Sequence, residues 1–137
     1  MGRFRVEFQI ANHRDVILAD NDAIDPGRVR RSIISGVVDT GATRLILPTS
    51  AAAALGLPES GETSVRFADG RTARRTVVSD AEIVIQGRSG TFSAVLEPNR
   101  TEALIGAIVL EELDFLVDCA NQRLVPRDPN TTITEIE

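Results

Sequence analysis

The stretch that decides the fold is Ile33-Ile34-Ser35-Gly36-Val37-Val38-Asp39-Thr40-Gly41-Ala42-Thr43, and a second apolar run, Leu45-Ile46-Leu47, follows it closely. The β-branched residues before Asp39 predict a buried strand. A carboxylate at the end of such a strand is costly to bury unless it is hydrogen-bonded, shared or functional. Asp39 is therefore a candidate functional residue, with a hydroxyl donor at Thr40 and a tight turn at Gly41 beside it.

Two motifs in the chain resemble those of one protein family. The sequence Val-Val-Asp-Thr-Gly-Ala (37–42) resembles the active-site loop of the pepsin and retropepsin aspartic proteases. Ala103-Leu104-Ile105-Gly106 resembles the apolar-apolar-Gly segment that crosses this loop in the family, and a short helix is expected after it over 107–113. The resemblance covers residues 30–126. It implies an all-β fold, a single retropepsin-like lobe with a closed barrel-like sheet and one or two short helices.

The resemblance also implies a role for the residues of both motifs. Asp39 is the catalytic carboxylate in this interpretation. The residues that support its loop are Thr40, Gly41 and Ala42, and those of the ψ-shaped crossing segment are Leu104, Ile105 and Gly106. Three other acidic residues lack a Thr-Gly setting and are interpreted as turn or surface carboxylates, namely Asp69, Asp114 and Asp118.

One Asp-Thr-Gly motif in the chain has a consequence for assembly. Aspartic proteolysis needs two carboxylates that face one water and share one proton. Since the chain has a single such motif, we expect a symmetric homodimer in which Asp39 of each copy lies at the two-fold axis. The expected partners are a second copy and a peptide or polypeptide substrate.

A hairpin is predicted between the two motifs. Asp69-Gly70 is a strong two-residue turn signal because both residues tolerate positive φ. By resemblance, this hairpin is the flap that closes over bound peptide, while the alternative is an ordinary surface hairpin. The residues at its tip are Phe67, Ala68, Asp69, Gly70 and Arg71.

Periodicity predicts the remaining elements. Residues 3–10 alternate polar and apolar as a half-buried strand, 12–15 form a turn, and 16–19 form a second short strand. Residues 48–56 have the marks of a short helix, with Pro at the start, an alanine run and Gly at the end. Further strands are expected at 29–38, 44–47, 76–85, 91–96, 114–119 and 123–126.

The chain departs from the viral retropepsins at two positions. Those enzymes carry an Asp after Asp-Thr-Gly-Ala and an Arg after the apolar-apolar-Gly, whereas this chain has Thr43 and Ala107. Loss of both partners is chemically consistent, because loss of one alone strands a buried charge. The chain thus resembles cellular, bacterial or archaeal, members. We expect one domain over 1–126 and a tail over 127–137, which is a candidate dimer-interface strand.

Composition excludes several classes of function. The chain has 137 residues, 42% of them hydrophobic, which is enough for one core. A net charge of -5 argues against a nucleic-acid surface. One Cys and one His exclude a disulfide framework and a Cys/His zinc site within one chain, so no metal or cofactor is expected. Without a long apolar run, the sequence predicts no signal peptide, no membrane contact and a cytoplasmic location.

Three hypotheses of function remain open. The first is a homodimeric aspartic endopeptidase whose cleft binds an extended peptide. The second is a non-catalytic dimeric module that binds peptides or proteins, for which a damaged Asp39 loop is expected, although the loop is intact. The third is an unrelated all-β domain in which Asp39 belongs only to a turn. Candidates for apolar pockets, or for core residues, are Leu45, Ile83 and Ile108.

Overall fold

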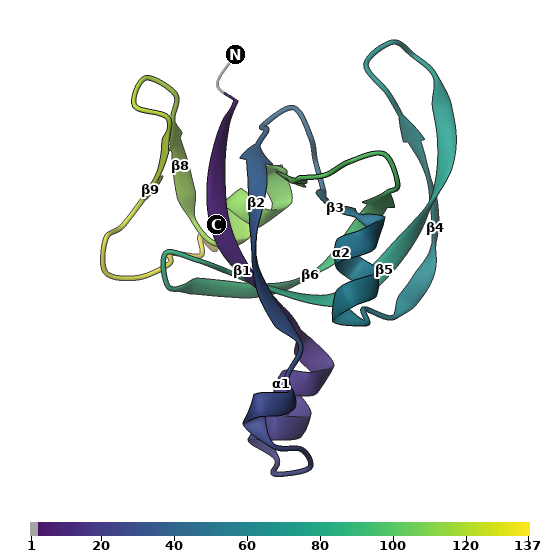
Figure 1. The fold of residues 1–137 in the computed structure, drawn as a ribbon. Coiled ribbons are helices and arrows are strands. Elements are labelled where there is room, and N and C mark those ends of the chain that lie inside the picture. Colours follow the sequence, from purple (N-terminus) through teal and green to yellow (C-terminus); the bar gives the residue numbers. More distant parts are fainter. Residues whose placement is uncertain (1–2) are drawn as a thin grey trace.

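The computed structural model describes residues 3–137, and its centre is a closed ring of β-strands (Figure 1). Within these residues the ring runs in the order β1-β2-β7-β3-β6-β5 and closes because β1 also pairs with β5. The six strands are β1 (Phe4–Asn12), β2 (Arg31–Val38), β3 (Leu45–Pro48), β5 (Thr72–Ile85), β6 (Arg88–Glu97) and β7 (Ala103–Ile105). The fold is therefore mostly β, and the expected closed barrel is confirmed.

One hairpin stands outside this ring. Strand β4 (Glu59–Arg66) pairs with β5 up to Val78, and β1 pairs with β5 after that point, while β6 pairs with β5 on both sides of it. A bulge between Val78 and Ala81, where Asp80 has a φ of 63°, separates the two halves. The sequence predicted one long or bent strand here, which is confirmed. Residues 59–61 begin β4.

Residues 3–137 also form three α-helices and one 3-10 helix. They are α1 (His13–Asp20), η1 (Pro26–Arg28), α2 (Thr49–Leu55) and α3 (Ala107–Glu112). The predicted helices after the two apolar segments are confirmed as α2 and α3. Gly56 ends α2 in the left-handed conformation, with φ of 62°. No helix in residues 3–137 has the length and apolar character needed to cross a membrane.

Helix α1 corrects the predicted turn and short strand at 12–19. The side chain of Asn12 accepts a hydrogen bond from the Asp15 N–H, which caps the helix. The Asp15 carboxylate in turn accepts bonds from Arg30 Nε at 2.8 Å and Nη2 at 3.0 Å. Ile17 and Leu18 are 45% and 43% exposed, so the apolar run does not form a buried strand.

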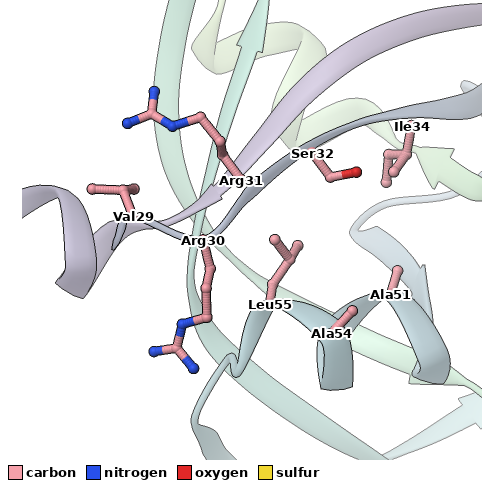
Figure 2. Close-up of a pocket in the computed structure, with 8 residues that line it drawn as sticks. All are labelled: Val29, Arg30, Arg31, Ser32, Ile34, Ala51, Ala54 and Leu55. Carbon is pink, nitrogen blue, oxygen red and sulfur yellow. The ribbon is translucent and has the colours of Figure 1, made fainter. Parts of the chain in front are cut away.

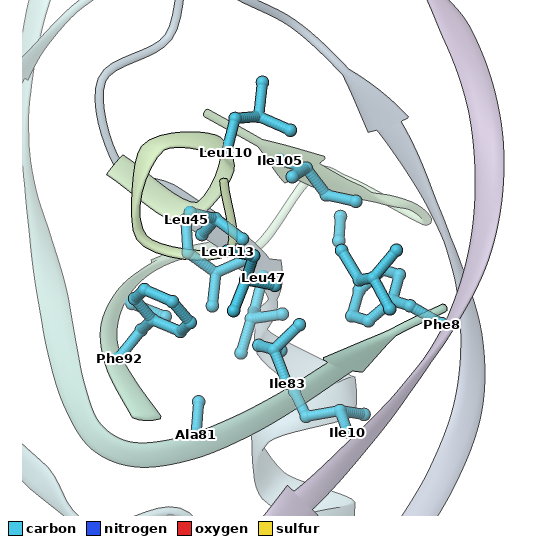
Figure 3. Close-up of a cluster of buried hydrophobic side chains, with 14 of the residues drawn as sticks. Phe8, Ile10, Leu45, Leu47, Ala81, Ile83, Phe92, Ile105, Leu110 and Leu113 are labelled. Carbon is cyan, nitrogen blue, oxygen red and sulfur yellow. The ribbon is translucent and has the colours of Figure 1, made fainter. Parts of the chain in front are cut away.

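The hydrophobic core fills the barrel, and Figure 3 shows its side chains converging from several strands. The largest fully buried side chains include Ile10, Leu45, Leu47, Ile83, Ile105 and Leu113. Leu45 and Ile83 are 1% and 0% exposed, so they are core residues and not lining of an open pocket. Gly36 sits on β2 where an added Cβ would lie 2.8 Å from the Phe8 ring, which lets β2 pack closely on this core.

The last part of the chain folds back on Asp114. After the small sheet of β8 (Phe115–Asp118) and β9 (Arg123–Pro126), residues 127–137 contain no helix or strand. The Asp114 carboxylate accepts the N–H of Ile133 at 2.9 Å and lies 2.8 Å from Arg127 Nε. Asp114 lies in the turn between α3 and β8, as interpreted, but it is 8% exposed and is therefore not a surface carboxylate. The Ile133 N–H, followed by the Arg127 guanidinium, lowers the pKa of Asp114.

Acidification is expected to release this tail. Because the pKa of Asp114 is lowered in the folded protein, the contact contributes fully to stability at a pH above the pKa of the unfolded chain, which is about 3.9. This contribution to stability is lost as the pH falls through the lower pKa that Asp114 has in the folded protein. We expect the exchange protection factor of the Ile133 amide to drop over that range. In Asp114→Asn, which keeps an acceptor oxygen without a charge, this pH dependence should disappear. Protection that is independent of pH in the wild type would contradict the prediction.

Candidate active site

Asp39 lies directly after β2, at a point where that strand is held on both sides. Residues 36–38 pair with β1 on one edge and with β7 on the other. The Asp39 N–H donates to the carbonyl of Ile105 at 3.1 Å, so this pairing continues through Asp39. Its side chain is 13% exposed. The strand thus delivers a carboxylate to the edge of the barrel, as the sequence predicted, but it is not a fully buried strand, because only Gly36 and Val38 of β2 are buried and Ile33 is 65% exposed.

The loop after β2 orients this carboxylate through its own backbone. The Gly41 N–H donates to Asp39 Oδ1 at 2.9 Å, and the Ala42 N–H donates to the Asp39 carbonyl at 3.1 Å. An added Cβ at Gly41 would lie 3.1 Å from Oδ1, which leaves little room for a larger residue. Thr40 and Gly41 are exposed, so the outer side of the loop faces solvent in the single chain.

The second motif crosses this loop at very short range. Ala107 N–H donates to the Ala42 carbonyl at 2.8 Å, and Ile108 N–H donates to the Thr43 carbonyl at 2.9 Å. An added Cβ at Gly106 would lie 2.5 Å from the Arg44 carbonyl oxygen. Thus Leu104, Ile105 and Gly106 are brought against the Asp39 loop. At the positions of the viral ion pair, Thr43 and Ala107, backbone hydrogen bonds join the two segments.

Arg3 is a neighbour of Asp39 that the sequence reasoning missed. Its Nη2 atom lies 3.0 Å from Asp39 Oδ2. The antiparallel register pairs Phe4 with Val38, so the next residues along the two strands of this one chain, Arg3 and Asp39, lie opposite each other. No local motif marks this contact, and only the register of β1 on β2 reveals it. Each oxygen of the Asp39 carboxylate therefore has a partner within residues 3–137.

The predicted flap residues lie together at the tip of the β4–β5 hairpin. The predicted two-residue turn is a three-residue loop, because Phe67 N–H bonds to the Arg71 carbonyl at 2.8 Å and Gly70 has a φ of 88°. The Arg71 guanidinium pairs with Asp69 and lies 5.2 Å from the centroid of the Phe67 ring. Ala68 is exposed beside them. In Figure 1 this tip and the end of β2 point to the same side of the molecule.

A separate cavity of about 300 Å³ lies between the start of β2 and α2 (Figure 2). Its lining includes Ser32 and Ile34 on β2 and Ala51 and Ala54 on α2. Ile34 precedes Asp39 by a stretch of strand about 16 Å long, at ~3.3 Å per residue. The cavity therefore does not belong to the Asp39 site. Of the candidate apolar pocket residues, Ile108 remains available, with 46% exposure beside the crossing segment.

Comparison with known proteins agrees with this geometry. A family model described as aspartyl protease matches residues 26–109, which include both motifs and more than half of the chain. Among solved structures, the chain is similar to the EIAV protease complexed with the inhibitor HBY-793. Sequence identity is 18%, the TM-score is 0.52, and the match covers 59% of this chain and 77% of that chain. This likeness concerns the fold alone. No curated protein matches the chain.

Proposed function

Because the chain belongs to the aspartyl protease family, we propose that it is an aspartic endopeptidase that acts as a symmetric homodimer. The observation that carries the proposal is the placement of Asp39. Its carboxylate lies at the end of β2 and accepts the Gly41 N–H, and the crossing segment holds the backbone of its loop through hydrogen bonds to Ala42 and Thr43. One chain supplies one such carboxylate, and a second copy supplies the other.

The proposed chemistry uses the pair of Asp39 residues as one unit. Two carboxylates a few Å apart share a proton, because both cannot ionise cheaply. The ionised member takes a proton from a water, and the water oxygen bonds to the carbonyl carbon of the scissile peptide. The protonated member donates its proton to the developing oxyanion. When the C–N bond breaks, the leaving nitrogen takes the proton that the first Asp39 received from the water and departs as an amine, while one hydroxyl of the tetrahedral carbon returns its proton to the Asp39 pair and becomes the new carbonyl.

Neighbouring residues receive supporting roles in this proposal. The exposed Thr40 is assigned to hydrogen bonds between the two loops across the axis, and Gly41 presents backbone to the substrate. The hairpin tip, residues 67–71, is assigned as a flap that closes over bound peptide and excludes water. An extended peptide in this cleft would be held by backbone pairing and side-chain pockets.

The proposed boundaries are one domain over 1–126 and a tail over 127–137, of which residues 1–2 lie outside the described part. Ile136 is 90% exposed and Ile133 is 45% exposed. These apolar side chains support the assignment of the tail to the dimer interface, where a second copy would cover them.

Cleavage of a broad peptide library between about pH 4 and 7 tests the proposed function. We expect the rate per chain to fall as the protein is diluted through its dimer dissociation constant, which sedimentation measures in parallel. Asp39→Asn is the inactive control. A wild type that is dimeric yet inactive over the whole range would contradict proteolysis. Binding of library peptides by that inactive dimer would instead favour the non-catalytic binding module.

A further inference from the structure

The Arg3–Asp39 ion pair is not explained by proteolysis alone. We propose that Arg3 is an intramolecular inhibitor of the Asp39 site, a role that rests on the proposed function. In the separate chain its guanidinium lies 3.0 Å from Oδ2, the carboxylate oxygen left free by the Gly41 N–H. Arg3 thereby occupies the oxygen that the water and the second carboxylate need.

The fold holds Arg3 at this place. Phe4, the first residue of β1, is buried with 7% exposure and pairs with Val38, so the backbone beside Asp39 is anchored. The Arg3 side chain itself is 72% exposed, whereas that of Asp39 is 13% exposed. The guanidinium therefore approaches the carboxylate from the solvent side. It can swing away by rotation of its own side chain, without loss of any β1–β2 pairing.

The chemistry of a guanidinium is incompatible with the working pair of carboxylates. Arginine carries only donors and keeps its charge at every working pH. It can neither take the proton that the two Asp39 residues share nor accept a hydrogen bond from the protonated member. A symmetric dimer would also bring two Arg3 side chains to the same axis, where like charges repel. Both side chains must therefore leave Asp39 before a peptide is cleaved.

The inhibition is reversible because the ion pair is weak. An ion pair with one largely exposed partner contributes little and is screened by salt. A change of about threefold to fivefold in activity is the size of effect that such a pair produces. Assembly of the dimer and binding of a peptide can overcome it. The contact thus lowers the activity at a given chain concentration and raises the chain concentration at which cleavage begins.

Arg5 supplies the matched control for an experiment. It follows Arg3 by two residues on β1 and pairs with Glu102 at 2.7 Å rather than with Asp39. We expect Arg3→Gln to raise kcat/KM about threefold to fivefold at low salt, near 0.05 M, and to match the wild type near 0.5 M salt. Arg5→Gln should stay close to the wild type at both salt concentrations. A purely structural role of Arg3 would not produce this salt dependence.

A second measurement detects the Arg3–Asp39 ion pair without any peptide cleavage. The Nε–H signal of Arg3 in an NMR spectrum should move when Asp39→Asn removes the charged partner, while the signal of Arg5 should not. An Arg3 signal that Asp39→Asn leaves unchanged would overturn the proposal.

Activity outcomes separate this proposal from the proposed function. If the wild type cleaves peptides and Arg3→Gln has equal or lower kcat/KM at low salt, inhibition is refuted and proteolysis stands. If dimeric wild type and dimeric Arg3→Gln are both inactive, the proposed function fails and inhibition fails with it. In that case, a shift of the Arg3 Nε–H signal in Asp39→Asn shows that the ion pair exists, so that the failed assumption is proteolysis and not the contact.

Discussion

Replacing Asp39 with asparagine is expected to lower kcat/KM by at least about 10³-fold and to leave the fold and the dimer intact. Asparagine keeps the shape of the side chain, and its Oδ1 can still accept the Gly41 N–H bond that the carboxylate accepts. It cannot take or give the proton that the reaction moves. Peptide cleavage measures the loss, and thermal unfolding and sedimentation show whether the variant remains folded and dimeric. Activity that survives in the folded variant would contradict the role of Asp39.

Mixed dimers make this prediction sharper. When Asp39→Asn chains are added in equal amount to a fixed amount of wild type, random pairing places about half of the wild-type chains in mixed dimers. Each mixed dimer has one carboxylate and is expected to be inactive, so total activity should fall to about half. Unchanged activity would mean that each chain works alone. Glu102→Gln chains, which keep Asp39, are the control and should leave activity undiminished.

Gly106→Ala is expected to lower the free energy of unfolding by about 3 kcal/mol, because the new methyl group meets backbone rather than side chains. Its Cβ would lie 2.5 Å from the Arg44 carbonyl oxygen and 2.7 Å from that of Ala42. The φ of Gly106 is −90°, which alanine adopts freely, so the loss reports the close crossing alone. The crossing segment would have to move away from the Asp39 loop.

Urea denaturation measures this loss, and two other glycines calibrate it. Gly27→Ala has a nearest neighbour at 3.3 Å, Asp25 Oδ1, and should change stability by less than about 0.5 kcal/mol. The Cβ added by Gly36→Ala would contact only side chains, which can move, with the Phe8 ring at 2.8 Å. The loss of stability should therefore lie between those of Gly27→Ala and Gly106→Ala. A Gly106→Ala protein as stable as Gly27→Ala would contradict the close crossing.

The sequence predicted the elements whose signals are local. The β-branched run before Asp39, the alanine run of α2 and the apolar segment before Gly106 each depend on neighbouring residues, and the structure has them where they were expected. Family resemblance then paired the two motifs, which the family match confirms. Helix α1 was missed because a β-branched run was given more weight than its cap. Asn12 followed by Asp15 after three residues is a helix-start pattern that identifies it.

Features that depend on distant pairing could not be predicted in this way. The contact of Arg3 with Asp39 follows from the register of β1 on β2, and burial of Asp114 follows from the return of the chain at Ile133. Neither residue has a neighbour in sequence that signals its partner. The sequence likewise does not show why residue 106 is glycine, because the atoms that exclude a side chain there belong to the distant residues 42–44.

The order in which the barrel strands pair also bears on how the chain folds during synthesis. Strand β3 has both of its neighbours later in the chain, since Leu45 pairs with Ala94 and Ile46 with Leu104. As the ribosome releases the chain, β1 and β2 can pair early, whereas β3 waits for β6, which ends at Glu97, and then for β7, which begins at Ala103. Folding that depends on such distant pairings is slow, on the order of milliseconds to seconds. Until these partners pair with it, the Leu45-Ile46-Leu47 run lacks its neighbouring strands, which leaves it open to chaperone binding or to aggregation in a nascent chain.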